Sequence, residues 1–99
     1  MKEIWYPKAI RVLLICYKLE AKKAKVYTSE LIRRMNLSWS HAYKLVKRLI
    51  ELGLLEGKRS GRTKFLKLTE LGREVAKRLY EIEQLLSKSQ GSEQQTQRD

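Results

Sequence analysis

From Pro7 to about Lys22, apolar residues recur with the period of an α-helix, at about 100° per residue. Only Arg11, Lys18 and Lys22 fall on one narrow polar strip, and apolar side chains cover nearly all the rest. A helix that is apolar almost all round has to be covered on more than one side. In so short a chain, we expect one side to face its own core and another to face a second subunit.

The next stretch, KAKVYTSEL, breaks this period. Residues 26–27 are compatible with a very short strand, and residues 29–35 predict a short second helix with its apolar side chains inward. Thr28 or Ser29 can cap this helix, and Glu30 falls in its positively polarised first turn.

A longer third helix is expected after Asn36, a residue that tolerates turn conformations. Ser38 is its predicted N-cap, and Gly53 ends it after Leu52, as glycine commonly does. One side of this helix is the expected core face, which carries Ala42, Leu45, Val46, Leu49 and Leu52.

After Gly53, two short extended segments joined by the turn RSGR predict a β-hairpin with a basic tip. Thr69 begins a fourth helix with a single apolar stripe, made of Leu71, Val75, Leu79, Ile82 and Leu86. Such a stripe packs on the body, on a partner helix or on both. From Ser87 the chain turns to Ser, Gln and Gly. We therefore expect one folded domain over residues 1–86 and a disordered polar tail over residues 87–99.

The chain has 99 residues and a formal net charge of +11, from 22 Lys and Arg against 11 Asp and Glu. Such an excess should attract a polyanion, with nucleic acid first and an anionic membrane surface second. A charged surface that serves only solubility is the alternative. The N-terminus has no signal-peptide layout, and the longest apolar run, VLLICY, is too short to cross a bilayer. We therefore expect a cytoplasmic protein with no membrane partner.

Cys16 and His41 are the only cysteine and the only histidine, so an intrachain disulfide and a Cys/His metal site are both excluded. The chain also lacks a Gly-rich phosphate loop. We predict no enzymatic activity, no catalytic residue and no cofactor. A buried structural thiol is the favoured interpretation of Cys16, with a disulfide to its own copy across a dimer axis as the alternative.

The third helix mixes hydroxyl, phenol and cationic groups opposite its core face, with no acid before Glu51. A DNA major groove admits one α-helix, whose N-terminal residues meet the base edges. Contact with DNA therefore explains an exposed Tyr43 better than burial does. Packing against the body is an equal alternative for Trp39 and His41, because both lie at the borders of the apolar stripe.

Residues 28–75, TSELIRRMNLSWSHAYKLVKRLIELGLLEGKRSGRTKFLKLTELGREV, resemble the winged helix-turn-helix superfamily of DNA-binding regulators. The segment LTELGRE looks like the strand-into-helix junction of MarR-like and related archaeal regulators. In size and composition, the chain is more similar to small archaeal and archaeal-virus winged-helix proteins. Its wing, KRSGRTK, lacks the Asp-x-Arg signature of the MarR family, so the resemblance implies no MarR-type effector pocket and names no effector.

The resemblance implies that residues 38–48 are the recognition helix and residues 59–64 the wing. The predicted DNA-binding residues are Ser38, Trp39, Ser40, His41, Tyr43, Lys44, Lys47, Arg48, Arg59, Ser60, Arg62 and Lys64. The predicted dimer interface, on the apolar faces of the first and fourth helices, contains Leu14, Cys16, Tyr17, Leu79, Ile82 and Leu86.

The expected fold class is α+β, mostly α: a winged helix-turn-helix with a long C-terminal helix. The expected function is that of a sequence-specific regulator of transcription. As a homodimer, it would place its recognition helices in the major groove of double-stranded DNA and its wings on the backbone or minor groove. Two other functions stay open. One is a sequence-tolerant architectural DNA-binding protein, and the other is a winged-helix module that binds proteins.

Overall fold

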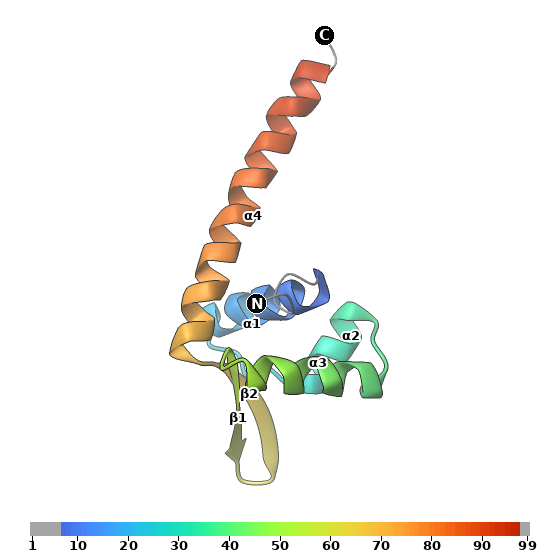
Figure 1. Ribbon diagram of the computed structural model, residues 1–99, viewed down its shortest axis with the longest axis vertical. Helices are drawn as coiled ribbons and strands as arrows, with labels where there is room; N and C mark the ends of the chain where they lie inside the picture. Colours follow the sequence, from blue (N-terminus) through green and yellow to red (C-terminus); the bar gives the residue numbers. More distant parts are fainter. Residues whose placement is uncertain (1–6, 98–99) are drawn as a thin grey trace.

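The computed structural model describes the backbone of residues 7–97 and the side chains of residues 7–88. The elements in this part are α1 (Pro7–Ala21), α2 (Thr28–Met35), α3 (Trp39–Glu51), β1 (Leu55–Ser60), β2 (Thr63–Leu68) and α4 (Glu70–Gln97). The two strands form one antiparallel hairpin. The hairpin and α4 leave the helical body on opposite sides (Figure 1). This architecture confirms the predicted mostly helical winged helix-turn-helix with a long last helix.

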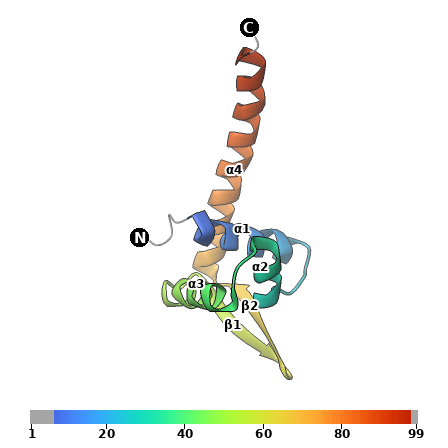
Figure 2. The ribbon, with the colours of Figure 1, turned by 90° about the vertical axis from the view of Figure 1, so that its right-hand side faces the viewer.

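The core forms where α1 packs against α3, β2 and α4. Four residues of α1 spaced by one, three or four positions are buried on one face: Ala9, Val12, Leu13 and Cys16. Side chains at these spacings share one side of a helix, so the polar strip predicted for α1 lies on the opposite side. In the view turned by 90°, α1 lies between α4 and the layer of α2, α3 and the hairpin (Figure 2).

The helix-turn-helix is built from α2, a short turn and α3. The N-cap of α2 is Tyr27, which makes no side-chain cap hydrogen bond, so the predicted capping by Thr28 or Ser29 is wrong. Glu30 in the first turn instead pairs with Arg33 and Arg34 of the next turn. Asn36 ends α2 in the left-handed conformation, at φ 54°, as the sequence predicted.

The hairpin is anchored at one end and free at the other. Leu55 pairs with Leu68 at its base, where both are buried, and Ser60 pairs with Thr63 beside the exposed turn. Gly61 in that turn has a φ of 62°, which a residue without Cβ adopts at little cost. The strand expected at residues 26–27 is a single bridge to β2, in which the backbone N–H of Leu66 donates to the carbonyl of Val26 at 2.7 Å.

One tight junction joins the end of α3, both strands and the start of α4. The Thr69 hydroxyl donates to the Gly53 carbonyl at 2.5 Å and accepts from the Gly72 N–H at 2.9 Å, so it caps α4 close to where the sequence predicted that helix to begin. The Thr69 N–H donates to the Leu54 carbonyl at 3.1 Å. The same carbonyl oxygen lies only 1.8 Å from the place where a Cβ at Gly72 would be.

Glu20 ties the hairpin base to α1 and α4. One carboxylate oxygen accepts from the backbone N–H of Leu68 at 2.7 Å, and the other accepts from the Arg73 guanidinium at 3.2 Å. The side chain of Glu20 is largely buried, which strengthens hydrogen bonds to a charged acceptor. A residue of α1 therefore fixes where β2 ends and α4 begins.

Among the α4 side chains that the structure describes, up to residue 88, those that pack on the body lie in the first half of the helix. Ala76 is fully buried and Leu79 partly so, whereas Ile82, Leu85 and Leu86 are all at least half exposed. The backbone of α4 continues to Gln97, past residue 87 where composition predicted a disordered tail. Within residues 7–97, no helix is both long enough and apolar enough to span a membrane.

We expect the substitution Gly72→Ala to lower the free energy of unfolding by about 3 kcal/mol, because a Cβ there meets a backbone carbonyl that cannot move aside. Urea denaturation followed by circular dichroism measures this. Gly57→Ala is the control, because a Cβ at Gly57 meets nothing within 4 Å. Equal midpoints for the two variants would show that the junction is not under this constraint.

Candidate nucleic-acid interface

The helix predicted to be the recognition helix, α3, begins at a well-formed cap. Ser38 has extended backbone angles, and its hydroxyl accepts a hydrogen bond from the His41 N–H at 3.1 Å, as the sequence predicted. The first turn of α3 contains no acidic residue. Its unpaired N–H groups and the positive end of the helix dipole therefore act without a neutralising side chain, which suits an anionic partner.

Burial on one side of α3 determines what the other side presents. Ala42, Val46 and Leu49 are buried against the body, and Leu45 and Leu52 are partly buried. This is the predicted core face. Its spacing of three and four leaves the remaining α3 positions turned outward.

The predicted DNA-contacting residues of α3 all lie on the surface. The large aromatic side chains are the most informative, because Trp39 is 64% exposed and Tyr43 is 69% exposed. The packing alternatives for Trp39 and His41 therefore fail, since neither side chain is covered by the body. The other exposed members are Ser38, Ser40, Lys44, Lys47 and Arg48. Arg48 contacts Glu51 at 3.4 Å at the end of the helix.

The hairpin carries a second group of cations to the same end of the molecule. Arg59, Ser60, Arg62 and Lys64 are exposed around the turn, as predicted for the wing. Lys58 differs from them because it pairs with Glu56 at 2.8 Å, and this bond is the main reason that the pKa of the Glu56 carboxyl is lowered. The cations nearest the tip are thus the ones left for a partner.

A cleft of about 370 Å³ separates α3 from the hairpin. Tyr43, Val46 and Ile50 line it from α3, and Arg59 and Phe65 line it from the hairpin. Ile50 and Phe65 are not among the site residues that the sequence predicted. Ile50 lies next to the apolar stripe of α3, which could have indicated a role. That it is 40% exposed in a cleft follows from the position of the hairpin, which the sequence does not give. The recognition helix and the wing therefore border one concave surface.

The apolar faces of α1 and α4 form a separate groove. Leu14, Leu79, Ile82 and Leu86, four of the predicted dimer residues, line it together with Ile10. Tyr17 is partly buried against Tyr80 of its own chain, with ring centroids 5.5 Å apart. In contrast, Cys16 is fully buried in the core of the subunit. It has no surface through which to meet a second chain, so its predicted place in the interface is wrong, and the alternative of an intersubunit disulfide falls with it.

The fold and the two basic elements define a winged helix-turn-helix protein. A family model described as a winged helix DNA-binding domain matches residues 11–72, from α1 to the first turn of α4. The chain belongs to this family of winged helix DNA-binding domains. Among the residues described, no group of three or more His, Cys, Asp or Glu side chains is placed to hold a metal ion.

Similar proteins occur in archaea and bacteria. The chain is 26% identical to an uncharacterized protein of Archaeoglobus fulgidus over 82 residues, which are 83% of this chain and 86% of the relative. The crystal structure of AF1382 from the same organism superposes with a TM-score of 0.74 at 24% identity, covering 84% of this chain and 92% of that one.

Two bacterial repressors share the fold. The adhesin competence repressor AdcR of Streptococcus pyogenes has a TM-score of 0.76 at 17% identity, over 92% of this chain and 66% of its own. The transcriptional repressor BigR of Xylella fastidiosa has a TM-score of 0.69 at 20% identity, over 82% of this chain and 76% of its own. At these identities the similarity establishes the fold alone.

We expect the Cys16 thiol to resist alkylation in the folded protein. Burial, with a smaller effect of the Glu20 carboxylate, raises the pKa of Cys16 from 9.0 to about 12. At pH 8 the reactive thiolate is therefore roughly a thousandfold scarcer than in an unfolded chain. Iodoacetamide labelling followed by mass spectrometry tests this, with the protein in guanidinium chloride as the control. Equal labelling rates in the two samples would contradict the buried position.

Proposed function

We propose that this winged helix domain is a homodimeric regulator of transcription that binds specific sites in double-stranded DNA in the cytoplasm. The observation that carries the proposal is the outer face of α3. It exposes two large aromatic rings beside cations, directly after the cap at Ser38. A surface that contacts only water gains nothing from exposed aromatic rings. In a major groove, the same rings can contact thymine methyl groups and sugars.

The arrangement of α3 supports insertion into a groove. Its N-terminal half presents Tyr43 and Lys44 outward, which is where a recognition helix meets base edges. Lys47 and Arg48 follow on the same exposed surface and are within reach of phosphates on either side. Together these residues supply hydrogen-bond donors, which phosphate oxygens and many base-edge atoms accept.

The wing supports a second contact. Its apolar base is fixed in the core and its basic turn projects freely, so the cations at its tip can follow the DNA surface. We assign Arg59 and Arg62 to the phosphate backbone or the adjacent minor groove. α3 and the hairpin both lie at the end of the body away from the projecting half of α4 (Figures 1 and 2), so one duplex can touch both.

The groove between α1 and α4 supports a second subunit. Ile82 and Leu86 are 50% and 57% exposed, although they belong to the same stripe as the packed Leu79. The equivalent groove of another copy would cover them. Two-fold symmetry then places two recognition helices on a pseudo-palindromic site, with half-sites about one helical turn apart.

BigR is a transcriptional repressor and AdcR an adhesin competence repressor, and this favours regulation over a purely architectural role. The architectural alternative needs only the net charge of +11. The exposed side chains of Trp39 and Tyr43 are also compatible with the protein-binding alternative, because aromatic residues are common in protein interfaces.

On a duplex selected for binding from a random library, we expect Tyr43→Ala and Lys44→Ala each to cost about 1–3 kcal/mol, and much less on a scrambled duplex. Arg59→Ala and Arg62→Ala should weaken both duplexes more evenly. Each wing variant should also flatten the dependence of log K on log salt by about one unit, because it removes one phosphate contact. Fluorescence anisotropy at several salt concentrations measures all of these effects.

The ratio of specific to scrambled affinity decides between the three functions. If the α3 variants lower both affinities and leave that ratio unchanged, α3 is only an electrostatic surface and the architectural function is favoured. If the wild-type chain binds neither duplex even at low salt, the DNA function fails and the exposed aromatic residues indicate a protein partner.

We expect Ile82→Glu to raise the dissociation constant of the dimer at least about tenfold, equivalent to 1.4 kcal/mol, because it puts a charge into an apolar interface. Sedimentation equilibrium measures this. Gln84→Glu adds the same charge at an exposed position on the other side of α4 and should leave the dimer intact. A wild-type chain that sediments as a monomer at micromolar concentration would contradict the two-fold arrangement.

A further inference from the structure

The polar strip on α1 has no part in the proposed contacts with DNA or with a second subunit. It consists of Arg11 and Lys18 of α1 and of Lys22, which directly follows the helix, spaced by seven and four residues, so the three cations lie along one side. Arg34 of α2 joins them, and the four cations surround one hollow of about 360 Å³. Its apolar wall is made by the partly buried Ile15 and Leu19.

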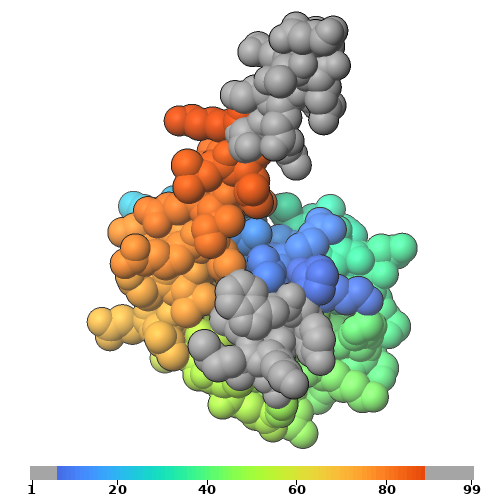
Figure 3. Space-filling model, turned by 45° about the horizontal axis from the view of Figure 1, so that its top comes forward, coloured from blue at the N-terminus to red at the C-terminus, as the bar shows by residue number. Residues whose placement is uncertain are grey.

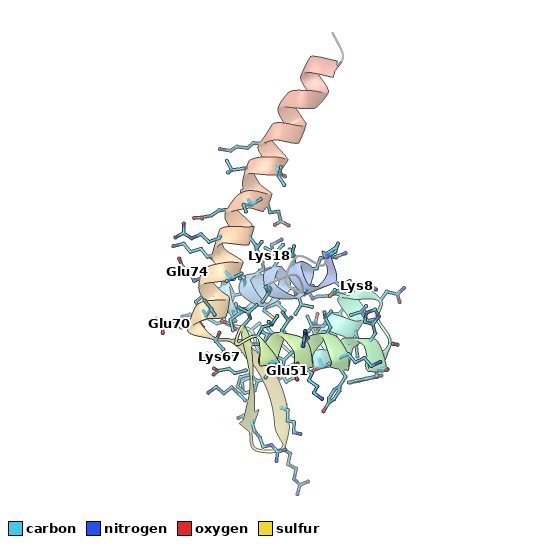
Figure 4. The ribbon with its side chains drawn as sticks, viewed as in Figure 1. Lys8, Lys18, Glu51, Lys67, Glu70 and Glu74 are labelled. Atoms are coloured by element: carbon cyan, nitrogen blue, oxygen red, sulfur yellow. The ribbon has the colours of Figure 1, made fainter. Side chains whose placement is uncertain are left out.

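This hollow lies on a different side of the molecule from the recognition helix and the wing. The strip is opposite the face of α1 that packs on the core, and α3 and β2 lie across that core. Lys18 lies on the side of α1 turned away from the hairpin (Figure 4). In Figure 3, the visible part of α1 lies at the surface between α4 and α2.

The positive charge of the hollow is only partly neutralised. Lys18 pairs with Glu83 of α4 at 3.0 Å, and Arg34 pairs with Glu30 at 2.6 Å. Within residues 7–88, Arg11 and Lys22 form no ion pair. Four cations that converge on one hollow repel one another, so the site gains stability from an anion that brings several charges.

We propose that this hollow, which we call the α1 pocket, binds a compact anion with several linked phosphate groups. Arginine holds phosphate through two parallel N–H donors, and lysine adds a point charge, so the pocket offers both modes. Along α1, Arg11 and Lys18 are about 10 Å apart in rise, which one phosphate group cannot bridge and a chain of two or three can. The volume falls in the usual range for small-molecule sites.

A long duplex fits this pocket less well than a compact anion. α4 rises from the body beside the C-terminal end of α1, so a straight duplex that followed the strip would run into it (Figure 1). The contact between Lys18 and Glu83 places α4 at the edge of the pocket. A rod-shaped ligand along the strip would therefore meet α4, whereas a compact anion need not reach it.

Calorimetric titration of the full chain with sodium tripolyphosphate, at 150 mM salt, tests the proposal. The wild type should bind one tripolyphosphate per chain. The double variant Arg11→Gln/Lys22→Gln should bind it at least tenfold more weakly. Arg59→Gln/Arg62→Gln is the matched control, because it also removes two exposed cations that form no ion pair within the described side chains, and its affinity should change less than twofold. Equal losses in the two variants, or titrations that do not saturate, would overturn the proposal.

Two nucleotides identify which feature of the anion is bound. ATP should bind like tripolyphosphate and lose affinity in the same variant, whereas AMP should bind at least tenfold more weakly because one phosphate reaches fewer cations. AMP that bound as tightly as tripolyphosphate would overturn the requirement for linked phosphates.

Duplex binding by the same two variants separates this site from the DNA interface. The wing variant should lose duplex affinity, and the Arg11→Gln/Lys22→Gln variant should keep it within twofold. A loss as large as that of the wing variant would make the α1 pocket part of the DNA surface and overturn the proposal. If the wild type binds no duplex but binds tripolyphosphate, the DNA function fails and the α1 pocket stands.

Discussion

The fold depends on the contact between the backbone of α4 at Gly72 and the carbonyl of Leu54. Leu54 lies just after the end of α3. Gly72, 18 residues later in the chain, lies in the first turn of α4, after the hairpin. Any side chain at Gly72 would separate the two segments, because a Cβ would lie 1.8 Å from that oxygen. The Thr69 hydroxyl then joins both sides of the junction, which sets the base of the wing relative to the recognition helix.

The two elements proposed to bind DNA, α3 and the hairpin, each have an anchored part and a free part. In the hairpin, the leucines of the base enter the core and the cations of the tip stay in solvent. In α3, the buried stripe holds the helix while the rings of Trp39 and Tyr43 remain exposed. Rigid attachment on one side and free polar groups on the other favour binding, because little conformational freedom is lost when a partner arrives.

α1 contacts more of the structure than its length suggests. One face supplies the core, a second borders the groove shared with α4, and a third carries the cationic strip. Glu20 near its C-terminal end also accepts from β2 and from α4. An anion in the α1 pocket would therefore act on the helix that connects the elements proposed to bind DNA with the proposed dimer face. Lys18 already pairs with Glu83 of α4, so such an anion would compete with a contact between α1 and α4.

The sequence by itself determined the order and type of the four helices and the hairpin, because periodicity, the cap at Ser38 and the glycines at 53 and 61 are local signals that tertiary packing here reinforces. It also identified the outer face of α3, since burying one stripe of a helix leaves the opposite stripe exposed. Only the tertiary structure decided the features that require contact between segments far apart in the sequence. Cys16 belongs to the core rather than to a subunit interface, Ile50 and Phe65 border one cleft, and Arg34 completes the cationic strip of α1. These positions follow from how helices and hairpin pack on one another, and no spacing along a single element records that geometry.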